Sequence, residues 1–244
     1  MPEKRERNLS YGKRRALRRR KLFIRRFVLF CLIVMSAAAG IFAGSELYAC
    51  FYGAATAEST SSDSKSSGRV KKAEKLTMPD WVTVDLIHKH GDARSGKKLS
   101  DINNIVIHYV GNPGTTAKNN RDFFDKNDTN VSSNFVVGLD GEIIQCLPVY
   151  EKSAASNWRN SDTISIEVCH EDESGKFNTE TYASVIKLTA WLCKELDLKS
   201  SDVIRHYDIT GKMCPVYYVN NKDAWKTFLN DVEKGINEYG TQKQ

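Results

Sequence analysis

Beyond its first 26 residues the chain has no surplus of positive charge. Its 244 residues carry a formal net charge of +6, with 36 Lys or Arg against 30 Asp or Glu. Residues 1–26 hold twelve of those cationic side chains and only two glutamates, so this tail carries +10 and the remainder −4. A domain that binds nucleic acid needs a basic face of its own. We therefore expect no nucleic-acid partner and interpret residues 1–26 as a basic cytoplasmic tail.

Charge is absent altogether from residues 27–45, FVLFCLIVMSAAAGIFAGS. These nineteen residues approach the ~20 that a helix needs to cross a bilayer, and cationic residues flanking a span stay in the cytoplasm. The pattern predicts a single-pass transmembrane signal-anchor in the cell membrane, with the following sequence outside. A signal peptide cleaved at residues 55–57 is an alternative that would give a secreted protein. N-terminal sequencing separates the two, because a start near Glu58 excludes the anchor.

A lipoprotein signal at residues 47–50, Leu-Tyr-Ala-Cys, is a weaker alternative. Tyr48 is bulky where such a signal has a small residue, and Glu46 interrupts the apolar run before it. This segment therefore does not displace the two interpretations above.

The cysteines are too few and too unevenly placed for a disulfide framework. The six lie at Cys31, Cys50, Cys146, Cys169, Cys193 and Cys214. The first two lie in or just after the uncharged segment, and Cys214 is a candidate metal ligand. The remaining three form an odd set, which argues against a disulfide framework. We expect them to be small buried hydrophobes, while one bridge among them stays open.

Between the uncharged segment and the folded part, residues 46–77 are expected to form a flexible linker. Residues 54–69, AATAESTSSDSKSSGR, are rich in serine and cannot bury enough apolar surface to fold. Folded sequence is expected to begin around Met78, and residues 78–240 are predicted to be the catalytic domain. No internal repeat is visible.

Within that domain, short apolar runs alternate with segments of helical spacing. Strands are expected at 103–110, 134–138, 142–147 and 163–169, and helices at 115–126, 178–196 and 222–236. Asp140-Gly141 predicts a hairpin turn, and Asn178 can cap its helix. Phe123 and Phe124 are expected to point inward. The order predicts an α/β fold, a single domain with a central mixed β-sheet flanked by helices.

Three residues far apart in the chain predict a metal site. His108 ends the apolar run of residues 105–110, and His206 and Cys214 lie eight residues apart in RHYDITGKMCP. A lone histidine at a strand end is usually only a packed side chain, so the prediction rests on the combination. Two imidazoles and one thiolate suit Zn²⁺ and leave a fourth position for water, as in catalytic zinc sites.

Four segments carry a resemblance to a known family, namely IVIHYVGNPGTTA, SSNFVVGLDGEIIQCLP, NSDTISIEV and VIRHYDITGKMCP. Over residues 81–238 the chain resembles the zinc-dependent N-acetylmuramoyl-L-alanine amidases of type 2, which are similar in fold to peptidoglycan recognition proteins. The resemblance implies that His108, His206 and Cys214 hold the zinc. It also implies that a zinc-activated water hydrolyses the amide bond between N-acetylmuramic acid and L-alanine in peptidoglycan.

The resemblance also gives two residues catalytic roles. Lys212, two residues before the cysteine, would stabilise the oxyanion, although a solvated turn lysine is the alternative. Glu167 is the one charged residue of the strand at 163–169, on the side opposite Ile164 and Ile166. The resemblance makes it the acid/base, and the alternative is a structural carboxylate bonded to backbone or to a ligand's second nitrogen.

Substrate contacts are the least defined part of the prediction. Asn134, Asn157, Asn160 and His170 are candidates to line the substrate groove. Phage lysozyme-type members of the family carry a catalytic tyrosine where this chain has Ser133 and Asn134, so that tyrosine's mechanism is excluded here.

Two other function classes stay open. A non-catalytic peptidoglycan-binding module is the main alternative, because recognition proteins of similar fold bind muropeptides without cutting them. A thiol hydrolase using Cys214 with His206 is the second, and it would survive a chelator that abolishes a zinc enzyme. The expected partners are peptidoglycan and, through the N-terminal helix, the membrane, and a monomer is expected.

Overall fold

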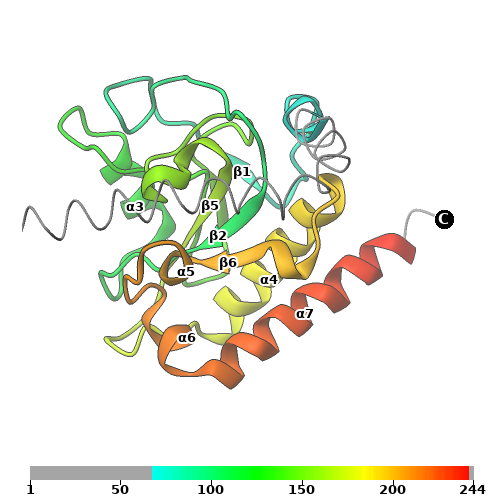
Figure 1. Cartoon of the computed structure of the whole chain (residues 1–244). Coiled ribbons are helices and arrows are strands. Elements are labelled where there is room, and N and C mark those ends of the chain that lie inside the picture. Colours follow the sequence, from blue (N-terminus) through cyan, green and yellow to red (C-terminus); the bar gives the residue numbers. More distant parts are fainter. Residues whose placement is uncertain (1–67, 242–244) are drawn as a thin grey trace, which may run out of the picture. The chain divides into compact units, whose positions relative to one another are not determined.

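The computed structural model describes residues 68–241, with side chains to Tyr239 (Figure 1). The predicted tail at 1–26, the predicted span at 27–45 and most of the predicted linker lie outside this range. Within it, no helix combines the length and apolarity that a bilayer crossing requires.

A six-stranded mixed sheet forms the centre of the domain. Its strands are β1 (Thr83–Val84), β2 (Asn104–Ile107), β3 (Phe135–Val137), β4 (Ile143–Gln145), β5 (Thr163–Val168) and β6 (Val203–Arg205). Their spatial order is β1-β4-β3-β5-β2-β6, and β3 with β4 is the antiparallel pair among otherwise parallel neighbours. The predicted α/β class and mixed sheet are confirmed.

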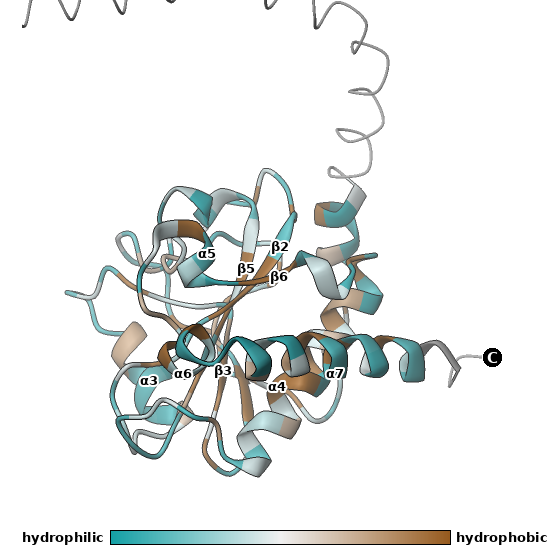
Figure 2. Cartoon of the chain, turned by 60° about the horizontal axis from the view of Figure 1, so that its bottom comes forward, coloured by the Kyte–Doolittle hydropathy of each residue, from teal (hydrophilic) through white to brown (hydrophobic). Residues whose placement is uncertain are grey.

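Helices cover both faces of this sheet. They are α3 (Ala117–Phe124), α4 (Thr179–Glu195), α5 (His206–Thr210), α6 (Val216–Asn220) and α7 (Lys222–Thr241), with 3₁₀ turns η1 (Asn157–Ser161) and η2 (Ser200–Asp202). α4 and α7 pack together on one face, where Leu188, Leu192 and Phe228 join the larger part of the core. α3 covers the other face. Figure 2 shows the hydrophobic strands and the largely hydrophilic outer side of α7.

Local sequence explains several of these elements. Asn178 caps α4 by accepting a hydrogen bond from the Thr181 backbone N–H at 2.9 Å, as predicted. The β3–β4 hairpin turns at Gly141, whose φ of +79° is left-handed. A Cβ there would also lie 2.8 Å from the Ser184 hydroxyl oxygen, so only glycine fits this turn.

The structure corrects two expectations. Phe123 does not point inward but is 46% exposed, because α3 uses Ala117 and Phe124 for its buried face. The folded domain also begins before Met78, since residues 68–73 are helical and Ala73 is part of the core. Arg69 secures this helix by donating to the backbone oxygens of Ile102 and Asp197, each at 3.1 Å.

All four cysteines in the described part of the chain are free and buried. Burial raises the pKa of Cys169 to about 12 and raises the pKa of Cys146 and Cys193 as well. Cys146, Cys169 and Cys193 therefore stay protonated and act as the small buried hydrophobes that the sequence predicted.

Asn134 is a structural residue, not the substrate contact that the sequence suggested. Its side chain is fully buried and uses both ends of its amide. The Nδ2 group donates to the backbone oxygens of Pro148 and Glu151 at 3.2 and 3.0 Å, and Oδ1 accepts from the Ser165 backbone N–H at 3.0 Å. Asn134 thereby joins β5 to the segment that follows Pro148.

We predict that Asn134→Ala destabilises the domain by about 3 kcal/mol, because each buried polar group left without a partner costs ~1–3 kcal/mol. Urea unfolding measures the change. Exposed Asn130→Ala is the matched control and should stay within about 0.5 kcal/mol of the wild type. Equal stability of the two variants would contradict the role of Asn134.

Candidate metal centre

The candidate metal ligands meet because three parallel strands end together. Ile107 of β2 is in register with Ile166 of β5 on one side and with Arg205 of β6 on the other. His108, Glu167 and His206 each follow these positions by one residue, so their side chains emerge at the same carboxyl edge of the sheet. In open α/β sheets, ligands bind at this edge.

Cys214 reaches the same place by a tight return of the chain. α5 runs from His206 to Thr210, and its C-cap residue Gly211, with a φ of +76°, turns the chain back. The Tyr207 backbone N–H then donates to the Cys214 carbonyl at 3.0 Å. This turn explains the eight-residue spacing between the histidine and the cysteine.

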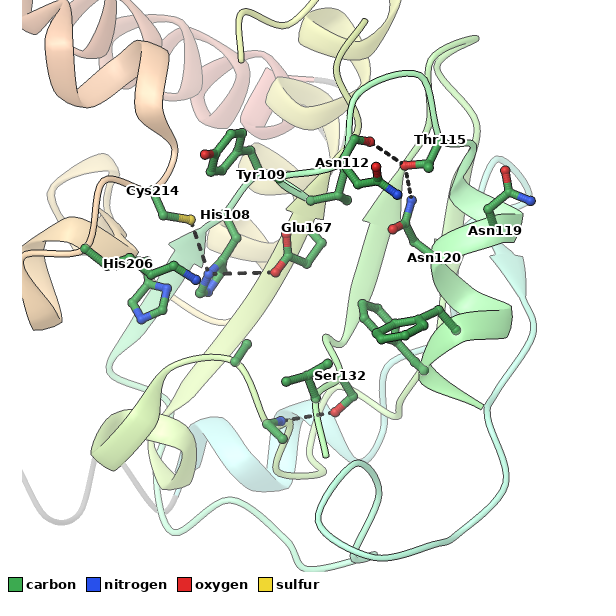
Figure 3. Close-up of a pocket in the computed structure, with 18 of the residues that line it drawn as sticks. His108, Tyr109, Asn112, Thr115, Asn119, Asn120, Ser132, Glu167, His206 and Cys214 are labelled. Atoms are coloured by element: carbon green, nitrogen blue, oxygen red, sulfur yellow. Dashed lines mark hydrogen bonds and ion pairs between the residues drawn. The ribbon is translucent and has the colours of Figure 1, made fainter. Parts of the chain in front are cut away.

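The three predicted ligands converge, each with one ligand atom within 4.8 Å of the others. Cys214 Sγ lies 3.8 Å from His108 Nδ1, and Figure 3 shows the His108 ring between Cys214 and Glu167. All three are at most 5% exposed. Burial lowers the pKa of His108 and of His206, which keeps both imidazoles neutral, the form that binds metals.

The hydrogen bonds of the two imidazoles fit a metal at this point. His108 Nε2 lies 3.5 Å from Ser156 Oγ, and His206 Nε2 lies 2.9 Å from Asn157 Oδ1. The other nitrogen of His206, Nδ1, is buried without a hydrogen-bond partner among residues 68–241. In a zinc site with two histidines and one cysteine, one nitrogen of each imidazole binds the ion and the other holds a hydrogen bond. The hydrogen-bonded Nε2 atoms of both histidines and the unpartnered Nδ1 of His206 fit that arrangement.

Glu167 lies beside the ligands, as predicted. Its Oε1 is 3.9 Å from His108 Nδ1, and its Oε2 is buried without a hydrogen-bond partner in the described structure. Burial raises the pKa of Glu167 to about 8, although the charge of Lys212 opposes this. A carboxyl group that titrates near neutrality can both accept and donate a proton.

Lys212 lies at the junction of two grooves. A cavity of about 770 Å³ is lined by His108, Glu167 and Cys214, and an adjoining one of about 500 Å³ shares His206 with it. Lys212 lines both grooves, and its positive charge acts on His108, His206, Glu167 and Cys214. A cation so placed favours negative charge that develops near the ligands.

Of the other predicted substrate contacts, Asn157 and Asn160 line the adjoining groove. Asn160 also holds the loop, because its Oδ1 accepts from the backbone N–H groups of Ala155 and Ser156. His170 lines neither groove. It is 1% exposed and stacks on Tyr109 with ring centroids 5.0 Å apart, so it supports the groove wall from behind.

Sequence reasoning missed Ser156 and the far wall of the main groove. That wall comes from the loop after β2 and from α3, and its polar members are Asn112, Thr115, Asn119 and Asn120 (Figure 3). Loop polar residues give no distinctive pattern. Phe123 also lines this groove. Which residues of α3 face the groove depends on where the helix begins and ends, and the sequence alone does not give those bounds.

We predict that Asn157→Gly weakens zinc binding about 10–100-fold, the usual effect of removing a ligand's hydrogen-bond partner. Asn157 has a left-handed φ of +55°, which glycine adopts without strain, so this change removes only the amide. Competition with a zinc chelator measures the dissociation constant. The neighbouring Trp158→Ala, at a side chain that is 68% exposed, should leave it unchanged. Equal affinities in all three proteins would refute the role of Asn157.

Comparison with known proteins agrees with this geometry. Residues 98–217 match the family model described as N-acetylmuramoyl-L-alanine amidase. The amidase CwlL of Bacillus licheniformis is 31% identical over 172 residues, which are 62% of this chain and 46% of CwlL. BlyA of Bacillus subtilis, also named an amidase, is 30% identical over 161 residues, 57% of this chain and 43% of BlyA. The chain therefore spans less than half the length of these relatives.

Solved structures show the same fold. The catalytic domain of XlyA aligns with a TM-score of 0.55 and 26% identity, over 62% of this chain and 98% of that one. PlyL aligns with a TM-score of 0.57 and 21% identity, over 63% and 98% of the two chains. Residues 98–217 are therefore similar in sequence to an N-acetylmuramoyl-L-alanine amidase domain, and the described domain has the fold of the XlyA catalytic domain.

Proposed function

We propose that the chain hydrolyses the amide bond between the lactyl group of N-acetylmuramic acid and L-alanine in peptidoglycan, using zinc. The observation that carries the proposal is the convergence of His108, His206 and Cys214 beside the buried carboxyl group of Glu167. The amidase names of CwlL and BlyA support the same bond.

Zinc bound at the three ligands would supply a Lewis acid for water and for the scissile carbonyl. Glu167 takes the proton of the attacking water, and Lys212 stabilises the negative charge that develops on the carbonyl oxygen. Glu167 then gives its proton to the departing L-alanine nitrogen. One water is consumed, the glycan keeps a free lactyl carboxylate, and the peptide leaves with a free amine.

Three competing functions fit the site less well. A glycosidase needs a pair of carboxylates across the bond, but Glu167 is the one carboxylate among the described residues that line the main groove. A thiol hydrolase needs a thiolate, whereas burial raises the pKa of Cys214 to about 12, with Glu167 adding to the shift. A nearby cation such as zinc stabilises that thiolate. A module that only binds peptidoglycan does not need a carboxyl group with a raised pKa, that of Glu167, beside three metal-ligand side chains.

The predicted anchor extends the proposal to location. An enzyme held in the cell membrane by residues 27–45, with its domain outside, could act on the adjacent wall. Membrane fractionation with N-terminal sequencing tests this, and an N-terminus near Glu58 in the soluble fraction would instead mean secretion.

The predicted products of muropeptide digestion by the zinc-loaded chain are a glycan with a free lactyl carboxylate and a peptide that starts at L-alanine. Mass spectrometry identifies them. A chelator should abolish the reaction and added zinc should restore it, because the ligands need an ion to activate water. Cleavage at a glycosidic or a peptide–peptide bond, or activity that persists without metal, would refute the proposal.

Glu167→Gln should lower kcat by at least about 100-fold, the usual contribution of a general acid–base, while bound zinc stays at the wild-type level. Steady-state kinetics and metal analysis measure the two effects. Glu180→Gln, at an exposed position in the first turn of α4, is the matched control and should retain full activity. Wild-type turnover in Glu167→Gln would remove this residue from the mechanism.

A further inference from the structure

A second set of metal-binding side chains lies outside both grooves. His88, His90 and Asp125 each place one ligand atom within 4.8 Å of the others, and none of them lines either groove. We propose that these three residues bind a second divalent transition-metal ion, for which zinc is the probe. This inference is independent of the proposed hydrolysis.

The backbone brings the three residues together. His88 and His90 are two residues apart in the loop that follows β1, and Asp125 caps the carboxyl end of α3. The His88 backbone N–H donates to Asp125 Oδ1 at 2.6 Å. Arg121 of α3 donates to the carbonyls of Asp85 and Leu86 at 3.1 and 3.0 Å, so the loop is held against the helix.

His90 supplies the strongest indication of a ligand. Its Nδ1 lies 2.8 Å from the His88 carbonyl oxygen and therefore donates to it, which leaves the lone pair on Nε2. That Nε2 is buried without a hydrogen-bond partner in the described part of the chain. A remote N–H held by a carbonyl is the usual support for a histidine that binds metal. A buried lone pair without a donor is costly, and an ion would satisfy it.

His88 and Asp125 present the other two ligand atoms. His88 Nδ1 lies 2.6 Å from Asp125 Oδ1, a contact between two acceptor atoms unless a proton or a cation lies between them. The second oxygen, Oδ2, accepts from Arg121 at 2.7 Å, which orients the carboxylate. Two imidazoles and one carboxylate are ligands that zinc and its neighbours in the transition series accept.

The surrounding charge favours a cation. Three carboxylates, those of Asp85, Asp122 and Asp125, surround Arg121, and Lys118 pairs with Asp122. Among these five side chains one negative charge is left over, and a cation between His88 and Asp125 would balance it. The rings of His88 and His90 are stacked, with centroids 4.3 Å apart, so one of them must rotate to aim its nitrogen at the ion. The side chain of His88 is 50% exposed, which leaves room for that rotation and for water as a further ligand.

An ion at this site would fasten the loop after β1 to the end of α3. The same loop continues to Asp92 and Lys97, which line the adjoining groove, and α3 is followed by Lys126, which lines the main groove. Binding would therefore stabilise two walls of the active cleft without supplying a group to the reaction.

The experiment counts zinc bound to the untagged chain of residues 1–244 by equilibrium dialysis at micromolar free zinc, followed by elemental analysis. The wild type should hold two equivalents, and His88→Ala/His90→Ala should hold one. His206→Ala/Cys214→Ser should also hold one, now at the second site. In the His206→Ala/Cys214→Ser variant, zinc should raise the Tm by a few degrees. Adding His88→Ala/His90→Ala to this variant should abolish the rise.

Two further variants keep the outcome clear. Lys89→Ala, an exposed change between the two histidines, should retain both equivalents. Asp125→Asn keeps an acceptor for the His88 backbone N–H but loses the charge, so it should lose one equivalent even if the histidine variants misfold. A zinc count that stays at the wild-type value in both His88→Ala/His90→Ala and Asp125→Asn overturns the proposal.

Discussion

The parallel register of β5, β2 and β6 is the constraint on which the candidate active site depends. It places the residues that follow Ile166, Ile107 and Arg205 side by side at one edge of the sheet. A shift of one residue in any of these strands would turn Glu167 or a histidine to the opposite face. The apolar residues of the same strands, packed under α4, hold that register. The core and the candidate metal centre are therefore specified by alternate residues of the same strands.

The loop between β4 and β5 also fixes the positions of the candidate ligands. Glu151 is 5% exposed and forms a two-pronged ion pair with Arg94, at 2.8 and 3.1 Å. Ser153 bonds Ser165 of β5 at 2.7 Å. Ser156 and Asn157, consecutive residues of this loop, then hold the outer nitrogens of both histidine ligands. One loop thereby orients two imidazoles that lie almost a hundred residues apart in sequence.

Much of this arrangement could be predicted from the sequence, since apolar periodicity located the strands and helices. The residue types of His108, His206 and Cys214 predicted their convergence. The role of Asn134 could not be predicted in the same way, because the sequence does not distinguish a loop asparagine that binds substrate from one that bonds the backbone. Its burial depends on β3, β5 and the loop after β4 at once. The same holds for His170, because its stacking on Tyr109 depends on how the segments after β2 and β5 meet.

The helix at residues 68–73 changes how far a membrane-tethered domain could reach. Because Arg69 and Ala73 attach this helix to the domain, the folded part begins ten residues earlier than the sequence suggested. For a chain held at residues 27–45, the greatest extension between the bilayer and the domain falls from roughly 110 Å to roughly 75 Å, at about 3.4 Å per residue. If the proposed anchor and the proposed amidase activity are both correct, wall layers beyond that distance would be out of range, and cleavage would be restricted to the peptidoglycan nearest the cell surface.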